Sequence, residues 1–225
     1  MLAAGAGVMG PPEAAVLVAT AAPALTEAFV RLTTKVSSIR IRRCGEVYSQ
    51  TAILSSMSIE ELTDRVISDD NLLEFCSRVL LAAQDIALSQ KRRGLARTLA
   101  ATALEPTPAR LDIAFLIETA IRDLDNGHIR FMTALSNEPR RPVDAPPGKY
   151  GLVMDEVVQR DQGLGEGAYA LLQGLISHGL VEDSTGGTSR LVAGTTYTLS
   201  ALGQRVYAVL SEEGFERVYD YTRPI

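Results

Sequence analysis

Two histidines and two cysteines are the residues of this chain best suited to metal binding or nucleophilic chemistry. His128, His178, Cys44 and Cys76 are far apart in the sequence, and no two cysteines have the spacing of a zinc or redox motif. A zinc site would require all four residues to converge. We therefore expect no metal site, and we expect both cysteines to act as small apolar residues on helices.

His128 is the residue most open to a catalytic interpretation. It lies within a helical pattern of apolar residues and has no nucleophile beside it in the sequence. We expect a neutral core histidine with one or two hydrogen bonds, and a ligand-binding or pH-sensing role is the alternative. The sequence contains no phosphate loop, nucleophile elbow or HExxH motif. It therefore predicts a protein that is not an enzyme and that uses no cofactor.

Two clusters of basic residues are candidates for contact with a partner. The first, on residues 31–43, contains no acidic residue, and the second lies on residues 91–97. Either cluster can meet phosphates or an acidic protein surface; the alternative is a solvated helix face paired with neighbouring acids. The candidate binding residues are Arg31, Lys35, Arg40, Arg42, Arg43, Lys91, Arg92, Arg93, Arg97 and, further along the chain, Arg190.

The net charge of −5 is unevenly distributed along the chain. Residues 1–149 contain 17 basic and 17 acidic residues, whereas residues 150–225 contain 5 basic and 10 acidic residues. The whole acidic excess therefore lies in the C-terminal third. A nucleic acid would be repelled by this part of the chain unless basic residues were gathered on one of its faces.

The N-terminal segment is apolar but does not have the pattern of a targeting or membrane-spanning sequence. It has no basic residue before Arg31, and the apolar run from Ala14 to Thr26 is shorter than the roughly 20 residues that span a bilayer. Pro23 is expected to kink or split the helix. We expect a helix that packs on protein, a cytoplasmic location and no membrane insertion. A membrane-peripheral or stress-response factor that uses this helix is an alternative.

Apolar periodicity predicts a helical bundle over residues 13–136. Ser58 and Glu61 match a capping box at one helix start. Further helix starts are predicted at Asp69, Thr107 and Ser200. The stripe from Ile117 to Leu135 predicts one long helix, although the turn signal at Asn126 offers a break.

A module over residues 149–211 follows a proline-rich loop at 137–149. Its pattern predicts helices over Tyr150–Gln159 and Glu166–His178, a glycine cap at Gly179, a β-hairpin and a final helix. The fold class is therefore expected to be mainly α, an N-terminal helical bundle followed by an α+β module with one β-hairpin.

The order of these elements resembles the second half of winged-helix domains, including those of MarR-like regulators. The matching residues are Leu175, Gly179-Leu180-Val181 and Tyr197-Thr198-Leu199-Ser200-Ala201-Leu202-Gly203, and the resemblance runs from Gly165 to Leu210 with the preceding helix. It implies that Glu166–His178 is the helix that enters the major groove of DNA. That helix contains no Lys or Arg, so contact with protein through Gly167, Ala168 and Tyr169 is favoured over contact with phosphates.

The sequence thus predicts a non-catalytic regulatory or assembly protein that acts through protein–protein contacts and self-associates. The tail at 212–225 is expected to dock on another surface through Phe215, Tyr219 and Tyr221. A DNA-binding transcription regulator of winged-helix type is the alternative, in which nucleic acid is the partner.

Overall fold

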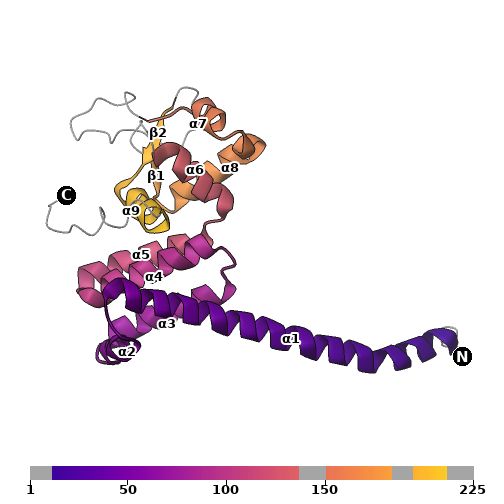
Figure 1. The fold of residues 1–225 in the computed structure, drawn as a ribbon. Coiled ribbons are helices and arrows are strands. Elements are labelled where there is room, and N and C mark those ends of the chain that lie inside the picture. Colours follow the sequence, from indigo (N-terminus) through magenta and orange to yellow (C-terminus); the bar gives the residue numbers. More distant parts are fainter. Residues whose placement is uncertain (1–11, 137–150, 184–194, 212–225) are drawn as a thin grey trace, which may run out of the picture. The chain divides into compact units, whose positions relative to one another are not determined.

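A computed structural model describes residues 12–136, 151–183 and 195–211, with side chains from Glu27 onward. These residues form nine α-helices, one 3-10 helix and one antiparallel hairpin, which confirms the mainly α class with a single β-hairpin (Figure 1). The elements are α1 (Pro12–Ser55), α2 (Ile59–Ile67), α3 (Asp70–Asp85), α4 (Ser89–Leu104), α5 (Pro108–Asp123), α6 (Asn126–Ser136), α7 (Met154–Arg160), η1 (Gln162–Gly167), α8 (Ala168–Ser177), β1 (Val181–Asp183), β2 (Tyr197–Leu199) and α9 (Ala201–Leu210).

The chain divides into two compact units, Met1–Arg42 and Arg43–Ile225. The expected division was instead at the loop 137–149, between a bundle over 13–136 and a module over 149–211. That loop and the tail 212–225 lie outside the described residues. Residues 43–136 of the expected bundle and the described residues of the expected module both belong to the second unit.

The described part of the first unit is the stretch of α1 over residues 12–42. The helix is not split at Pro23, and it continues to Ser55. Among the described residues, no helix combines the length and the apolar character needed to cross a membrane.

Helix α4 lies at the centre of the second unit and packs against α2, α3, α5 and α9. Every residue from Gly94 to Ala103 is buried. A Cβ atom on Gly94 would lie 3.1 Å from the Leu210 side chain and 3.2 Å from that of Ile121, so the glycine lets α9 and α5 approach closely. Small residues therefore allow α4 to be enclosed by its neighbours.

The predicted helix starts are confirmed. Ser58 and Glu61 form the capping box: the Ser58 hydroxyl accepts from the Glu61 amide at 3.1 Å, and the Glu61 carboxylate accepts from the Ser58 amide at 2.7 Å. The side chains of Asp69, Thr107 and Ser200 each accept a hydrogen bond from a first-turn amide of α3, α5 and α9, respectively.

The predicted long helix over Ile117–Leu135 is wrong. Helix α5 ends at Asp123, and α6 begins at Asn126. Asp125 caps the new helix, because its carboxylate accepts from the His128 amide at 3.0 Å, and its own amide donates to the His128 ring at 3.2 Å. The turn signal at Asn126 was the better indicator, since apolar periodicity continues across the break and conceals it.

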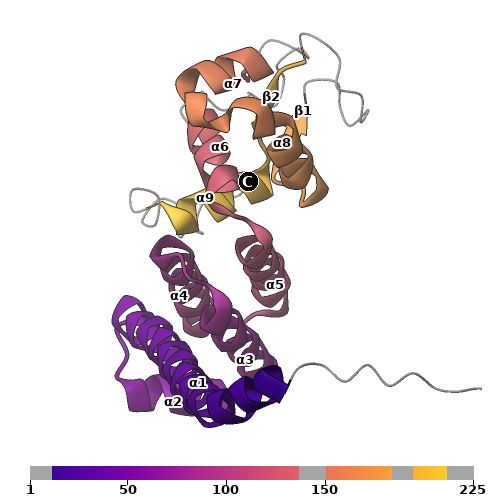
Figure 2. The same ribbon diagram turned by 90° about the vertical axis from the view of Figure 1, so that its right-hand side faces the viewer.

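Helices α6 to α9 and the hairpin gather on one side of α4 and α5 (Figures 1 and 2). Strand β1 pairs antiparallel with β2, and Leu152 adds an antiparallel bridge to Tyr197 of β2, with N–O distances of 3.0 and 2.9 Å. Strand β2 therefore lies between β1 and Leu152. The preceding residue, Gly151, has φ +99°, and a Cβ there would lie 2.5 Å from the Tyr197 carbonyl oxygen.

Helix α6 packs against α7, α8, α9 and β2, so it belongs with the C-terminal elements. The order in this part of the chain is α6, the Leu152 bridge, α7, η1, α8, β1, β2 and α9. The helix expected over Glu166–His178 begins later than predicted, because residues Gln162–Gly167 form a 3-10 turn before α8.

Hydrogen bonds join the start of α9 to the residues that follow α8. Gly179, with φ +67°, ends α8, and its carbonyl accepts the Ser200 hydroxyl at 2.5 Å. The Ser200 amide donates to the Leu180 carbonyl at 3.0 Å. A Cβ on Gly203 would lie 1.9 Å from the same carbonyl oxygen. The residues that carry the sequence resemblance are therefore the ones that hold α8, the hairpin and α9 together.

Candidate protein-binding surface

Helix α8 presents an uncharged face to solvent. Tyr169 is 52% exposed, and Ala170 and Gln173 are exposed beside it. Gly167, which precedes the helix, is also exposed. Ala168 is only 1% exposed and lies in the core, so this predicted interface residue has no surface to offer a partner.

The opposite face of α8 is fixed by close packing. Leu172 and Leu175 are fully buried. A Cβ on Gly174 would lie 2.5 Å from Nε2 of His128, which shows how closely α6 approaches α8. His128 is therefore a packing and capping residue, half-buried between Asp125 and α8, rather than a member of a continuous helical stripe.

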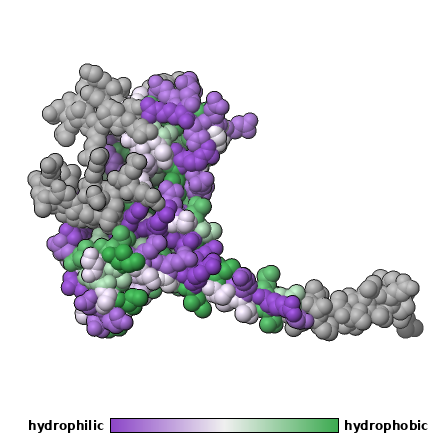
Figure 3. All heavy atoms as spheres, viewed as in Figure 1, coloured by the Kyte–Doolittle hydropathy of each residue, from purple (hydrophilic) through white to green (hydrophobic). Residues whose placement is uncertain are grey.

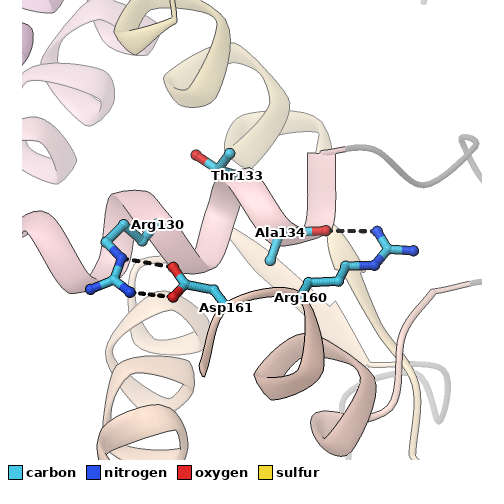
Figure 4. A pocket seen from close by; sticks show the side chains of 5 residues that line it. All are labelled: Arg130, Thr133, Ala134, Arg160 and Asp161. Carbon is cyan, nitrogen blue, oxygen red and sulfur yellow. Dashed lines mark hydrogen bonds and ion pairs between the residues drawn. The ribbon is translucent and has the colours of Figure 1, made fainter. Parts of the chain in front are cut away.

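The turn before α8 is tied to α6 by an ion pair. The Arg130 guanidinium donates through Nε to Oδ2 of Asp161 at 2.7 Å and through Nη2 to Oδ1 (Figure 4). Asp161 also accepts from the Gly163 amide at 3.0 Å. Hydrogen bonding to Arg130 holds the pKa of Asp161 below its usual range, so the carboxylate stays ionised at neutral pH.

An open hollow of about 510 Å³ lies beside this pair, lined by Arg130, Thr133, Ala134, Arg160 and Asp161 (Figure 4). Arg160 donates to the Ala134 carbonyl at 2.9 Å, near the C-terminal end of α6. The lining thus consists of an ion pair, a guanidinium bound to a helix end and a hydroxyl. These groups position α7 and η1, and they do not form the nucleophile–base pair of a hydrolytic site.

The basic residues of α4 (Lys91, Arg92, Arg93 and Arg97, hereafter the α4 cluster) are drawn into the fold. Lys91 is 6% exposed, and its ammonium donates to the carbonyls of Arg122, at 2.9 Å, and Leu124. Burial lowers the pKa of Lys91, and the nearby carboxylates of Asp123 and Asp125 oppose that shift. The ammonium therefore satisfies the carbonyls that the break after α5 leaves without helical partners.

The guanidinium groups of Arg97 and Arg92 also donate hydrogen bonds to backbone carbonyls of other segments. Arg97, 9% exposed, donates to the carbonyls of Val209 at 2.8 Å and Ser211 at 3.0 Å, at the C-terminal end of α9. Arg92 donates to the Ala87 carbonyl at 2.7 Å and pairs with Glu46 at 3.1 Å. Arg93 is half-buried. In this conformation, Lys91 and Arg97 present no surface to a phosphate or an acidic partner.

The basic residues of α1 (Arg31, Lys35, Arg40, Arg42 and Arg43, hereafter the α1 cluster) lie mostly on the surface. The first four are exposed, and Arg31 pairs with Glu27 one turn earlier. Arg43 is half-buried and donates to the Gln84 carbonyl at 2.8 Å. Lys91 and Arg97 of the α4 cluster are therefore buried, whereas four of the five residues of the α1 cluster are exposed.

Cys44 and Cys76 are free thiols. Burial raises the pKa of both, that of Cys76 to about 11, which makes each a poor nucleophile at neutral pH. Within the described ranges, no group of three or more His, Cys, Asp or Glu side chains is arranged to hold a metal ion.

Four predicted site residues, Arg190, Phe215, Tyr219 and Tyr221, lie outside the described residues. The pair Arg130–Asp161, which positions α8, was not among the sequence-derived candidates. Its local signal is Asp161 two residues before Gly163, the spacing at which an aspartate caps a turn.

Comparison with known proteins adds no relative: models of protein families, curated proteins and solved structures all gave no match.

Proposed function

We propose that this chain is a non-catalytic regulatory or assembly protein, and that residues 126–211 form a winged-helix module that uses α8 to contact another protein. The order helix, isolated β-bridge, two helices, hairpin and helix supports the winged-helix assignment. Under this proposal α6, which packs against α7, α8 and α9, is the first helix of the module.

The uncharged exposed face of α8 is the observation that carries the proposal. A helix that reads duplex DNA needs basic side chains near phosphates and polar side chains at base edges. The exposed positions of α8 are Tyr169, Ala170, Gln173 and Ser177, and none of them is charged. An exposed aromatic residue flanked by small, uncharged residues is typical of the centre of a protein interface.

Site-specific photo-crosslinking in living cells tests this proposal. A photoreactive amino acid replaces Tyr169 or Gln173 in the full chain, and the control position is Leu116 of α5, which is 56% exposed. We expect one discrete protein adduct from both α8 positions, and its loss when Ala170 is changed to Glu. Adducts with nucleic acid, or equal adducts from Leu116, would overturn the proposal.

DNA binding is the second candidate, and the exposed α1 cluster is the observation that favours it. Here the affinity comes from α1, so it falls steeply with salt concentration. Fluorescence anisotropy with a random duplex, at low and at moderate ionic strength, measures that dependence. Charge reversal at Arg40 and Arg42 abolishes binding under this candidate function; a wild-type chain that does not bind the duplex at low salt eliminates it.

A further inference from the structure

The exposed part of α1 carries an apolar stripe. Phe29 is 67% exposed, Leu32 65% and Val36 41%, and Ile39 is half-buried. Their spacing of three and four residues places them on one side of the helix. Figure 3 shows hydrophobic side chains at the surface of this part of α1. Three large side chains of the stripe are therefore exposed among the described residues.

The stripe has the heptad repeat of a two-helix seam. Phe29 and Val36 occupy one core position of the repeat, and Leu32 and Ile39 occupy the other. The sequence continues the same repeat towards the N-terminus with Ala15, Val18, Ala22 and Leu25. Apolar residues at these positions over several heptads indicate that the partner is another helix with the same repeat.

The charges along the helix decide the direction of pairing. Residues 12–30 contain no basic residue, whereas Arg31, Lys35, Arg40 and Arg42 follow within twelve positions. In a parallel pair of identical helices, Lys35 faces Arg40 of the other copy twice, and like charges at these positions are destabilising.

An antiparallel pair removes this repulsion. When Phe29 of one copy lies beside Leu32 of the other, Lys35 faces Ala28 of the second copy, and Arg42 faces Ala21. The basic half of each helix then lies along the half of its partner that has no basic residue.

We infer that two copies of this chain associate through an antiparallel pair of α1 helices over residues 19–42, with Phe29 of each copy packed beside Leu32 of the other. This pairing specifies the self-association included in the proposed function, and it does not depend on what α8 contacts.

Analytical ultracentrifugation of the full chain tests the association. We expect wild type to sediment at twice its 24.2 kDa mass. Phe29→Asp places a charge in the seam and is expected to raise the dissociation constant at least 30-fold, about the effect of losing one interface hot spot. The matched control is Ile41→Asp: Ile41 is 73% exposed and lies on the side away from the stripe, so this variant remains a dimer.

A monomeric wild type at high concentration, or equal dissociation by both variants, would contradict the inference. A monomer that sediments with phosphatidylserine vesicles, and loses this property in Phe29→Asp, would instead assign the stripe to a membrane surface. Absence of a discrete adduct from the chains with a photoreactive residue at Tyr169 or Gln173 would refute the proposed function and leave the α1 pair intact, so the two failures are distinguishable.

Disulfide formation tests whether the two α1 helices pair in the antiparallel direction. Ala28→Cys and Lys35→Cys are made in separate chains; the native thiols are a half-buried and a buried cysteine, both with a raised pKa and low reactivity. An antiparallel pair forms a disulfide in the mixture of the two variants but not in either variant alone. A disulfide in a mixture of Lys35→Cys and Arg40→Cys chains, whose positions face each other in a parallel pair, with none between Ala28→Cys and Lys35→Cys, would overturn the inferred direction.

Discussion

The α4 cluster and the α1 cluster look alike in sequence but differ in exposure: Lys91 and Arg97 are buried, whereas most of the α1 cluster is exposed. Both are runs of Lys and Arg on a helix, with few acids nearby. The ammonium of Lys91 and the guanidinium of Arg97 turn inward to helix ends, whereas Lys35 and Arg42 face solvent. A basic run therefore does not by itself mark a binding surface.

The surroundings of each cluster explain the difference. Lys91 lies four residues before Leu95, which is fully buried, so its side chain starts on the face of α4 that enters the core. There it meets backbone carbonyls at the end of α5 that need donors. Residues 31–42 of α1 flank a stripe that is itself exposed, and the basic residues among them are exposed as well.

We expect the largest difference in unfolding free energy between the two clusters when Lys91→Ala is compared with Lys35→Ala. Removal of the buried ammonium leaves the carbonyls of Arg122 and Leu124 without their donor, which costs about 3 kcal/mol of unfolding free energy. Lys35→Ala changes it by less than about 0.5 kcal/mol. Urea denaturation of both variants measures the difference, and similar midpoints would remove the distinction between the clusters.

Arg97→Ala against Arg42→Ala repeats the comparison with a smaller expected effect. Arg97 holds the end of α9 through the Val209 and Ser211 carbonyls, so its loss is expected to cost about 2 kcal/mol. The exposed Arg42 is expected to contribute less than about 0.5 kcal/mol. Limited proteolysis should cleave Arg97→Ala first near α9, and cleavage of both variants at the same rate would contradict this role.

Local signals in the sequence were reliable guides to the helix ends. The box at Ser58 and Glu61, the caps at Asp69 and Thr107, and the glycine end at Gly179 all depend on a few neighbouring residues, so they could be predicted. The break at Asp125 was missed because apolar periodicity is the same on both sides of it.

The candidate site was harder to predict than the fold. The interior position of Lys91 depends on where α5 ends, and the pairing of Arg130 with Asp161 joins residues from α6 and from the turn after α7. Neither contact is local in sequence. The exposure of Tyr169 and the burial of its neighbour Ala168 likewise depend on how α8 is rotated against α6, and no short motif encodes that rotation.

Asp161→Asn extends the comparison to the Arg130–Asp161 ion pair, which lies nearer the surface than Lys91. We expect this substitution to have the smallest effect on stability. Because Arg130 lowers the pKa of Asp161 in the folded state, the stabilisation is fully present above the usual value of 3.8 and is lost as pH falls through the lower folded pKa. The melting temperature of wild type should exceed that of Asp161→Asn at neutral pH. The gap should begin to narrow as pH falls below about 3.8, and it should close only below the lowered folded pKa, where the wild-type carboxylate is protonated. A gap independent of pH would show that this carboxylate does not stabilise the fold through its charge.

Hydrogen–deuterium exchange of the full chain at low and at high protein concentration tests the central contrast most directly. The amides of residues 27–42 are expected to exchange more slowly as concentration rises, because association covers this helix. Those of residues 89–104 should be strongly protected at every concentration, because the fold itself encloses α4. Exchange over residues 27–42 that is equally fast at all concentrations would contradict the assignment of α1 to association.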